Sequence, residues 1–275
     1  MVSVRRLAFV CGLCLLGFAA LAQNLPQPPA NALNYFLKAL RTEAGLNVSG
    51  TVNERQLFPP RKDADAVRKD LPAPPPISLA LLRRNWTAQT SIGETIAGRD
   101  TWRVDLTPTN RNTPSFTYWF DREWNVRLGV DERDPYGTLT YSARYSAITK
   151  PTKRGTARQL TLLDPRPKLE EFVRAQIGAY ALPEGFRLMD IRPRTVRDDR
   201  PAVDLRASNG LSVLVIVFSP VSTGRTPKLA VRDLKGSWVW VVGNLVTADL
   251  DAVAQSIRAP LEIGSLLNGF NDVPR

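Results

Sequence analysis

The stretch FTYWFDREWNVRLGVDERDPYGTL, residues 116–139, places aromatic and branched side chains on alternate positions, breaks at Asp121 and then alternates again. Alternation with a period of two is typical of a β-strand, in which successive side chains point to opposite faces. The break at Asp121 and the turn sequence DPYG at 134–137 interrupt the pattern as hairpin turns do. The stretch therefore predicts strands that are joined by tight turns.

The same pattern extends in both directions, from Leu79 to Ile148, as short alternating segments with turn residues between them. Regular spacing of this kind predicts an antiparallel meander. The alternating segments lie at 81–92, 94–108 with a break at Gly98, 115–121, 125–132 and 138–148. Two sets of side chains each share one face of their strand, namely Trp102, Val104 and Leu106, and Phe116, Tyr118 and Phe120.

Upstream of the meander, residues 31–45 carry apolar side chains at helical spacing, with Asn31 placed to cap the start and Gly45 near the end. Residues 48–58 have the pattern of a strand. Residues 59–77 are charged and rich in proline, so we expect a long exposed loop there, with a mobile lid as the secondary interpretation.

Downstream, a second amphipathic helix is predicted with Pro167 near its first turn, followed by two hairpins. The first hairpin has Asn209 and Gly210 at its turn, a pair that is favoured because both residues accept positive φ. The segment TADLDAVAQSIR predicts a closing helix capped by Thr247 or Asp249. This half of the chain is expected to form a small α+β unit with three to five strands.

Residues 149–159 are polar, basic and without periodicity, so they end the meander or link two domains. The expected organisation is a signal peptide, a first domain, a small C-terminal α+β domain and a tail, at residues 1–22, 23–160, 166–260 and 261–275.

The first residues have the layout of a secretory signal peptide. Arg5 and Arg6 precede sixteen residues without charge, and the segment ends in the small-x-small sequence Ala20-Leu21-Ala22. Sixteen residues are fewer than the roughly 20 that a membrane-spanning helix needs. We expect export to the periplasm and cleavage after Ala22, with an uncleaved anchor as the alternative.

Cys11 and Cys14 both lie in this segment, so the mature protein is expected to fold without disulfides. The chain has no histidine, which removes histidine-activated nucleophiles and most zinc sites. Neighbouring carboxylates such as Asp131 and Glu132 point to opposite faces of a strand and make poor acid-base pairs. We therefore expect a protein that is not an enzyme and that uses no metal and no cofactor.

The chain carries a formal net charge of +11, which removal of the two signal-peptide arginines lowers to +9. A basic surface attracts polyanions, but there is no nucleic-acid recognition motif, and an exported protein seldom meets nucleic acid. Anionic lipid head groups at a membrane surface, an acidic segment of a partner, or simple solubility remain as explanations. Four arginines near one strand could bind phosphate or carboxylate groups or could form a solvated surface: Arg187, Arg192, Arg194 and Arg197.

Aromatic and branched residues are concentrated in the meander, and a sheet face this apolar must be covered by a helix, a second sheet or a ligand. Because one predicted helix covers little of so large a sheet, a cavity for an apolar ligand and ordinary core packing are both open. The candidates for the cavity are Trp86, Trp102, Val104, Leu106, Phe116, Tyr118, Phe120, Val126 and Leu128.

The stretch from "AGR" at 97–99 to Gly137 resembles the LolA-like superfamily, and within it the RseB/MucB family of periplasmic sigma-factor regulators. The shared pattern is the AGR turn, then Tyr118, Trp119 and Asp121 at a strand end, then a hairpin and Asp-x-x-Gly at 134–137. The segments LPEGFRL, SNGLSVLVIVF and VWVVGNLVTADLDAVAQSI resemble the smaller C-terminal domain of that family, which a plain lipoprotein carrier lacks.

The resemblance implies an α+β fold, with a LolA-like unclosed antiparallel β-barrel, helices against its concave side, and a small C-terminal α+β domain. It also implies a lipid-sensing regulator that binds the periplasmic segment of an anti-sigma factor, or alternatively a periplasmic lipoprotein or lipid carrier that uses the same cavity. Two features depart from the family: the hairpin sequence REWNVRL at 122–128 and the proline content of 59–77.

Overall fold

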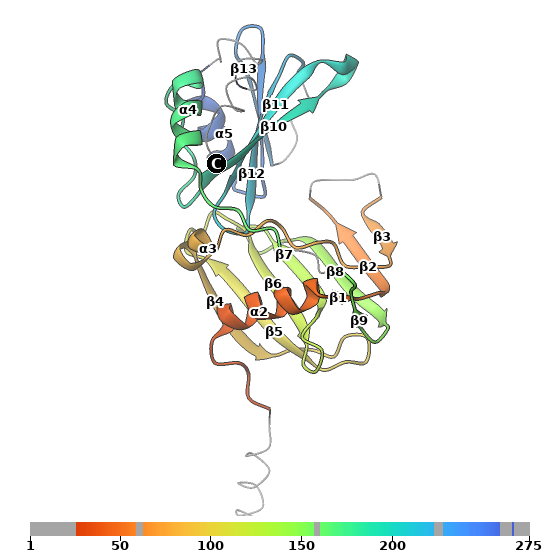
Figure 1. Ribbon diagram of the computed structural model, residues 1–275. Coiled ribbons are helices and arrows are strands. Elements are labelled where there is room, and N and C mark those ends of the chain that lie inside the picture. The colour runs from red at the N-terminus through yellow and green to blue at the C-terminus, as the bar shows by residue number, and fades with distance from the viewer. Residues whose placement is uncertain (1–25, 59–62, 157–159, 223–227, 259–265, 267–275) are drawn as a thin grey trace, which may run out of the picture. The chain divides into compact units, whose positions relative to one another are not determined.

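The computed structural model describes residues 26–58, 63–156, 160–222, 228–258 and 266 (Figure 1). The expected signal peptide and cleavage site, and the expected tail apart from Leu266, lie outside these residues. The chain divides into two units, Met1–Ala30 and Asn31–Arg275, and the second contains every helix and strand discussed below. None of the described helices combines the length and the apolar character needed to cross a membrane.

The predicted meander forms β4 to β8, which are consecutive neighbours in a seven-stranded antiparallel sheet with the order β3-β2-β8-β7-β6-β5-β4. Its two end strands, β3 and β4, do not pair with each other, so the sheet is open, as expected for an unclosed barrel. The strands are β2 Gly50–Gln56, β3 Asp65–Arg68, β4 Trp86–Ile92, β5 Thr101–Pro108, β6 Ser115–Asp121, β7 Arg127–Arg133 and β8 Leu139–Ile148.

The register of β5 and β6 confirms the face predicted from the alternation. Val104 lies opposite Tyr118, and Leu106 lies opposite Phe116. The break at Asp121 is the start of the β6–β7 hairpin, where Asn125 adopts a positive φ of 53°. The opening stretch of sequence therefore forms two neighbouring strands in the middle of the sheet.

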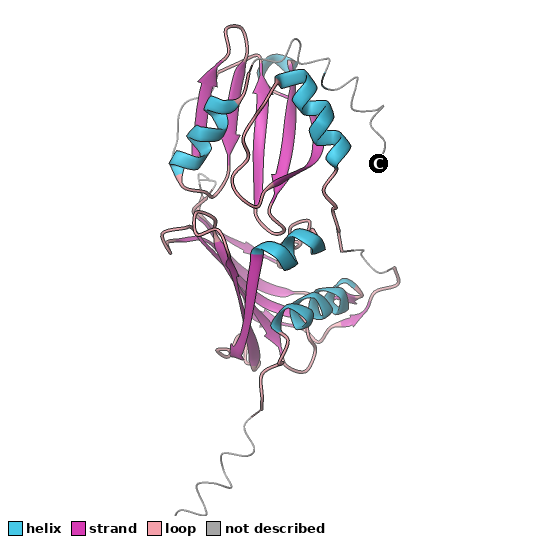
Figure 2. Cartoon of the chain, turned by 90° about the vertical axis from the view of Figure 1, so that its left-hand side faces the viewer, coloured by secondary structure: helices cyan, strands magenta, loops and turns pink. Residues whose placement is uncertain are grey.

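Helix α2, Ala32–Ala44, begins and ends where the sequence predicts. Asn31 caps it by accepting a hydrogen bond from the Asn34 backbone N–H at 3.0 Å. The helix lies across one face of the seven-stranded sheet (Figure 2), and its buried residues include Phe36, Leu37 and Leu40. Aromatic side chains of the sheet therefore pack against this helix.

The predicted strand over 81–92 is wrong in its first part. Residues Leu79–Asn85 form a short helix, α3, and β4 begins only at Trp86. Ser78 caps α3 by accepting a hydrogen bond from the Leu81 backbone N–H, and Leu81 and Leu82 are buried. Seven residues make only about two helical turns, which is too short for the apolar spacing to distinguish a helix from a strand.

The prediction that 59–77 is one exposed loop is wrong in two places. Asp65–Arg68 forms the edge strand β3, which pairs with β2. Ile77 is fully buried and forms an isolated parallel bridge with Leu162. The signal is weak because an edge strand that faces water on both sides shows no apolar alternation.

The polar segment 149–159 also contains regular structure. Its residues Thr152–Lys153 form β9, which pairs with β1, Leu46–Asn47, as a separate two-stranded sheet. A ladder of two residues is too short to produce any periodicity in the sequence.

The second half of the chain is the α+β unit that the sequence predicts, with a five-stranded antiparallel sheet of order β10-β11-β12-β14-β13. Helices α4, Pro167–Ile177, and α5, Thr247–Ser256, lie on one face of this sheet (Figure 2). The strands are β10 Arg187–Thr195, β11 Pro201–Ser208, β12 Val213–Ser219, β13 Leu229–Asp233 and β14 Trp238–Val242, with the 3-10 turn η2, Arg197–Asp199, between β10 and β11.

Two local predictions in this half are wrong. The residue before α5 is Val246, and neither Thr247 nor Asp249 caps the helix through its side chain. At the β11–β12 turn, Gly210 has a positive φ of 120°, whereas Asn209 instead accepts hydrogen bonds from the next backbone N–H groups. The turn is therefore a longer loop held by an asparagine side chain, because four residues separate the strands.

Each sheet has its own apolar core. One contains Phe36, Tyr118 and Leu128, and the other contains Leu169 and Leu250. Both cores lie within the unit Asn31–Arg275. The expected boundary between domains at residues 160–166 stays a prediction.

Candidate ligand pocket

All nine side chains that the sequence marks as cavity candidates are buried: Trp86, Trp102, Val104, Leu106, Phe116, Tyr118, Phe120, Val126 and Leu128. Part of this face packs on α2, since the Phe36 ring lies 5.0 Å from Tyr118 and 6.0 Å from Phe120 between centroids. Phe116 and Tyr118 also line a pocket, whereas the other seven do not border it. The aromatic face is thus mainly protein core, with one part bordering a pocket.

This pocket has a volume of about 460 Å³, which lies in the range of about 300–1,000 Å³ typical of small-molecule sites. It is bordered by the inner face of the seven-stranded sheet, by β12 and the residues around β14, and by the prolines of the 59–77 segment. Its apolar wall includes Phe58, Pro72, Pro74, Pro75, Phe116, Tyr118, Val130, Val215, Val242 and Leu245.

The proline-rich segment explains how one wall can be a loop. Residues Pro72, Pro74 and Pro75 have no backbone N–H, and their fixed φ favours an extended chain. A loop of this kind can lie on an apolar surface with fewer backbone donors left unpaired. The sequence predicted an exposed excursion here, but the structure places its end against the pocket.

Arg127 lies at the pocket and is 3% exposed. Its guanidinium pairs with Glu43 of α2 at 2.6 Å, and its backbone N–H donates to the same carboxylate at 3.1 Å. Burial lowers the pKa of Arg127, but the charge and hydrogen bonds of Glu43 together raise it by more, so the guanidinium stays charged. This ion pair joins α2 to the sheet beside the pocket.

The carboxylate of Glu54 on β2 is buried and is also paired. It binds the Arg68 guanidinium and accepts a hydrogen bond from the Tyr141 hydroxyl at 3.1 Å. Burial raises the pKa of Tyr141, and the negative charge of Glu54 raises it further. The phenol therefore remains a neutral donor.

Glu132 of β7 also lines the pocket, but its polar contacts differ from those of Arg127 and Glu54. It accepts a hydrogen bond from the Asn244 side-chain amide at 2.7 Å, and no Lys or Arg of the described residues lies within ion-pair distance of it. Burial raises the pKa of Glu132, while the Asn244 hydrogen bond and the charge of Lys228 lower it in part.

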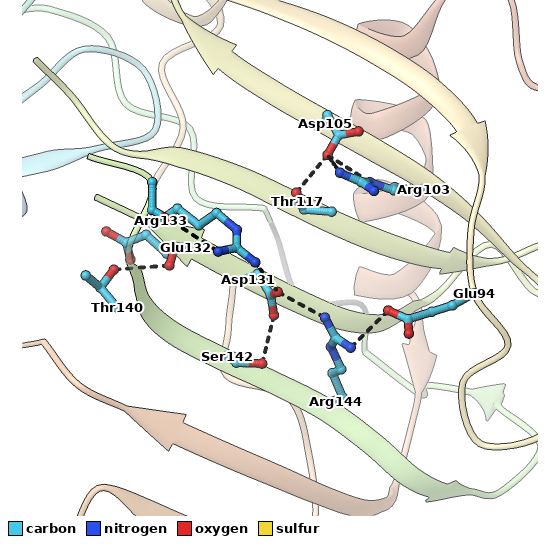
Figure 3. Close-up of polar contacts among 11 residues, drawn as sticks. Glu94, Arg103, Asp105, Thr117, Asp131, Glu132, Arg133, Thr140, Ser142 and Arg144 are labelled. Atoms are coloured by element: carbon cyan, nitrogen blue, oxygen red, sulfur yellow. Dashed lines mark hydrogen bonds and ion pairs between the residues drawn. The ribbon is translucent and has the colours of Figure 1, made fainter. Parts of the chain in front are cut away.

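The carboxylates on the opposite face of the sheet are engaged with cations (Figure 3). Asp131 accepts hydrogen bonds from Ser142 at 2.7 Å and from Arg144 at 3.0 Å, and Arg144 also pairs with Glu94 at 2.9 Å. Asp105 is bound by a neighbouring arginine and threonine in the same view. Paired carboxylates of this kind are structural, and among the described residues no group of three or more potential ligands could hold a metal ion.

An ion pair joins the AGR turn at 97–99 to the end of strand β6. Arg99 donates to both oxygens of Asp121, at 2.7 and 3.1 Å, and lies 3.7 Å from the Trp124 ring. The preceding AGR turn is tight because Ala97 and Gly98 both adopt positive φ. Asp121 is fully buried and also accepts the backbone N–H groups of the hairpin, so the motif stabilises the fold.

The four candidate partner-binding arginines are exposed and follow β10 into η2. Arg192 pairs with Asp190 at 2.6 Å and Arg194 pairs with Asp204 at 3.3 Å. Arg187 borders a different pocket, of about 380 Å³, whereas Arg197 begins the 3-10 turn. The structure does not gather the four around one cavity.

The sequence interpretation missed the polar groups of the main pocket. Alternation offers a signal for two of them, because Glu54 follows Val52, and Glu132 follows Val130, on the inner face. Ser212 and Asn244 reach the pocket only through the long-range packing of the chain, for which the sequence gives no local signal.

No protein-family model matches the chain, and no curated protein matches it. Several solved structures are similar to it. MucB superposes with a TM-score of 0.57 at 16% identity over 84% of this chain and 98% of its own. The MucA/MucB complex of Pseudomonas aeruginosa gives 0.57 at 16% over 85% and 100%, and MucB with MucA(peri) gives 0.52 at 18% over 84% and 98%. The chain therefore has the fold of MucB, in agreement with the resemblance seen in its motifs.

Proposed function

We propose that this chain is an exported, non-enzymatic binding protein that holds the periplasmic segment of an anti-sigma factor and thereby represses an envelope-stress sigma factor. The observation that carries the proposal is the likeness to MucB, which covers 84% of this chain and 98% of that protein's chain. Two of the similar structures are complexes of MucB with MucA or its periplasmic part. Binding of a comparable segment is the function that this architecture supports best.

The pocket supports a lipid-sensing role within that function. Its volume of about 460 Å³ and its apolar wall suit an acyl chain, and Phe116 and Tyr118 border it. A regulator of this kind would release its partner when lipid fills the pocket, because a ligand shifts an equilibrium by its difference in affinity for the two states.

Export is supported by the arrangement of residues 1–22, with Arg5 and Arg6 before an uncharged segment and a small-x-small end after it. A non-enzymatic role is supported by the absence of histidine from the sequence and by the ion pairs that hold Asp121 and Asp131 on the sheet. The exposed residues Arg192 and Arg194 are candidates for contact with acidic side chains of the partner.

Gene deletion separates this function from the alternative, a lipoprotein or lipid carrier that uses the same pocket. Loss of a repressor should raise transcription of the sigma-factor regulon without envelope stress and should leave lipoprotein sorting intact. Loss of a carrier should leave lipoproteins in the inner membrane. Mislocalised lipoproteins with an unchanged regulon would contradict the proposed function and support the carrier.

A further inference from the structure

One end of the main pocket brings together three polar side chains from separate parts of the chain: Glu132 on β7, Ser212 before β12 and Asn244 after β14. Ser212 and Asn244 are each 6% exposed. All three residues line the pocket.

The unpaired atoms at this end are hydrogen-bond acceptors. The Asn244 amide nitrogen donates to Glu132 at 2.7 Å and to the Thr140 hydroxyl at 2.8 Å, which fixes the orientation of the amide. Its oxygen is then buried without a partner among the described residues, as is the Ser212 hydroxyl. A buried polar atom that lacks a hydrogen bond is unfavourable, so a donor on a bound molecule would stabilise both.

The charge at this end is also uncompensated. Arg127 and Glu54, the other charged groups on the wall, are each held in an ion pair, with Glu43 and Arg68 respectively. Among the described residues Glu132 has no such pair, since Lys228, whose charge acts on it, is bound to Asp134 at 3.2 Å. A partly buried carboxylate with one amide hydrogen bond favours a cationic donor.

We propose that Glu132, Ser212 and Asn244 bind the primary ammonium group of an amphiphile whose alkyl chain lies along the apolar wall of the pocket. An ammonium has three donors and no acceptor, which matches a carboxylate, an amide oxygen and a hydroxyl oxygen. The inference rests on the lipid-sensing part of the proposed function and adds to it the chemistry of the ligand's polar end. A fatty acid would place a second carboxylate against Glu132, which is unfavourable.

Displacement of the neutral fluorescent probe N-phenyl-1-naphthylamine from the purified chain tests this at neutral pH. The competitors are dodecylamine, dodecanol and dodecanoate, which share one alkyl chain and differ in their polar end. Dodecylamine is expected to bind about tenfold more tightly than the other two, as one charge-assisted hydrogen bond warrants. Glu132→Gln should remove this preference and leave dodecanol binding unchanged, and Ser212→Ala should reduce the preference in part.

Glu171→Gln is the matched control, because Glu171 is exposed on α4 and distant in sequence from the pocket residues, and it should retain the preference. Equal binding of the three competitors, or a preference that survives in Glu132→Gln, would overturn the ammonium site. Val215→Trp, which fills the pocket, distinguishes failure of the ammonium site from failure of ligand binding in the pocket. If the probe binds this variant as well as the original chain, the pocket is not the ligand site and the lipid-sensing role itself fails.

Discussion

The Arg127–Glu43 pair is a residue-scale contact that joins α2 to the sheet. Removing one member of a buried ion pair leaves the other charge without compensation. Glu43→Gln is therefore expected to lower the free energy of unfolding by about 3–5 kcal/mol, measured by urea denaturation. Asp65→Asn is the control, because the Arg55–Asp65 pair is 3.8 Å long and exposed, and should change stability by less than about 1 kcal/mol. Equal effects of the two variants would contradict this account.

Glu132 gives the protein a pH dependence of known sign. Burial raises the pKa of this carboxyl above its ordinary value of 4.5. Its favourable contribution is therefore fully present below pH 4.5 and is lost as the pH rises through the folded-state pKa, because the folded state binds the proton more tightly.

Glu132→Gln removes this titration while keeping an oxygen for the Asn244 amide. The variant should be more stable than the original chain at neutral pH, and the difference should shrink as the pH falls toward 4.5, as urea denaturation across the pH range will show. Glu171→Gln is the control and should show no such trend. A difference that grows toward acid would mean that Glu132 is stabilised as an anion.

At the scale of the element, α2 decides how much of the aromatic face is core. Phe36 is 1% exposed and packs on Tyr118 and Phe120. Phe36→Ala should lower the free energy of unfolding by about 3–5 kcal/mol. Leu57→Ala, at a position that is 41% exposed, should have a much smaller effect. A small loss for Phe36→Ala would indicate that α2 packs only loosely on the sheet and leaves a larger cavity beneath it.

Elements with a strong local signal could be predicted from the sequence. Strand β5 and the first part of β6 alternate because one of their faces is more deeply buried than the other, and α2 combines a helical apolar stripe with a capping asparagine. Helix α3, the edge strand β3 and the short pair β1–β9 lack these signals, because they are short or face water. The polar end of the pocket could not be predicted as a whole, since Ser212 and Asn244 reach Glu132 only through tertiary packing.

At the scale of the whole molecule, the unit Asn31–Arg275 depends on close contacts around α3. Asn85 donates from its side-chain amide to the backbone oxygens of Gly185 at 2.9 Å and Asn209 at 3.0 Å. Trp86 donates to the same Asn209 oxygen at 3.2 Å. The β11–β12 loop is therefore bound to the helix that precedes the meander's edge strand.

Gly210 allows this approach. A Cβ atom there would lie 2.6 Å from the Leu82 backbone nitrogen, and φ is +120°. Gly210→Ala should lower the free energy of unfolding by more than about 2 kcal/mol, because backbone strain and a backbone clash add. Gly236 has nearly the same φ, +121°, with open space around it, so Gly236→Ala measures the strain alone. Equal losses in thermal unfolding would show that the contact with α3 is loose.

The central claim is that this MucB-like architecture binds an anti-sigma factor segment. Isothermal titration calorimetry of the purified mature protein with the periplasmic segment of the anti-sigma factor encoded in the same genome tests it most directly. We predict binding with a Kd of about 1 μM or tighter, weakened at least about tenfold by Arg192→Glu combined with Arg194→Glu. A folded protein that gives no binding heat and does not co-elute with the segment would contradict the account.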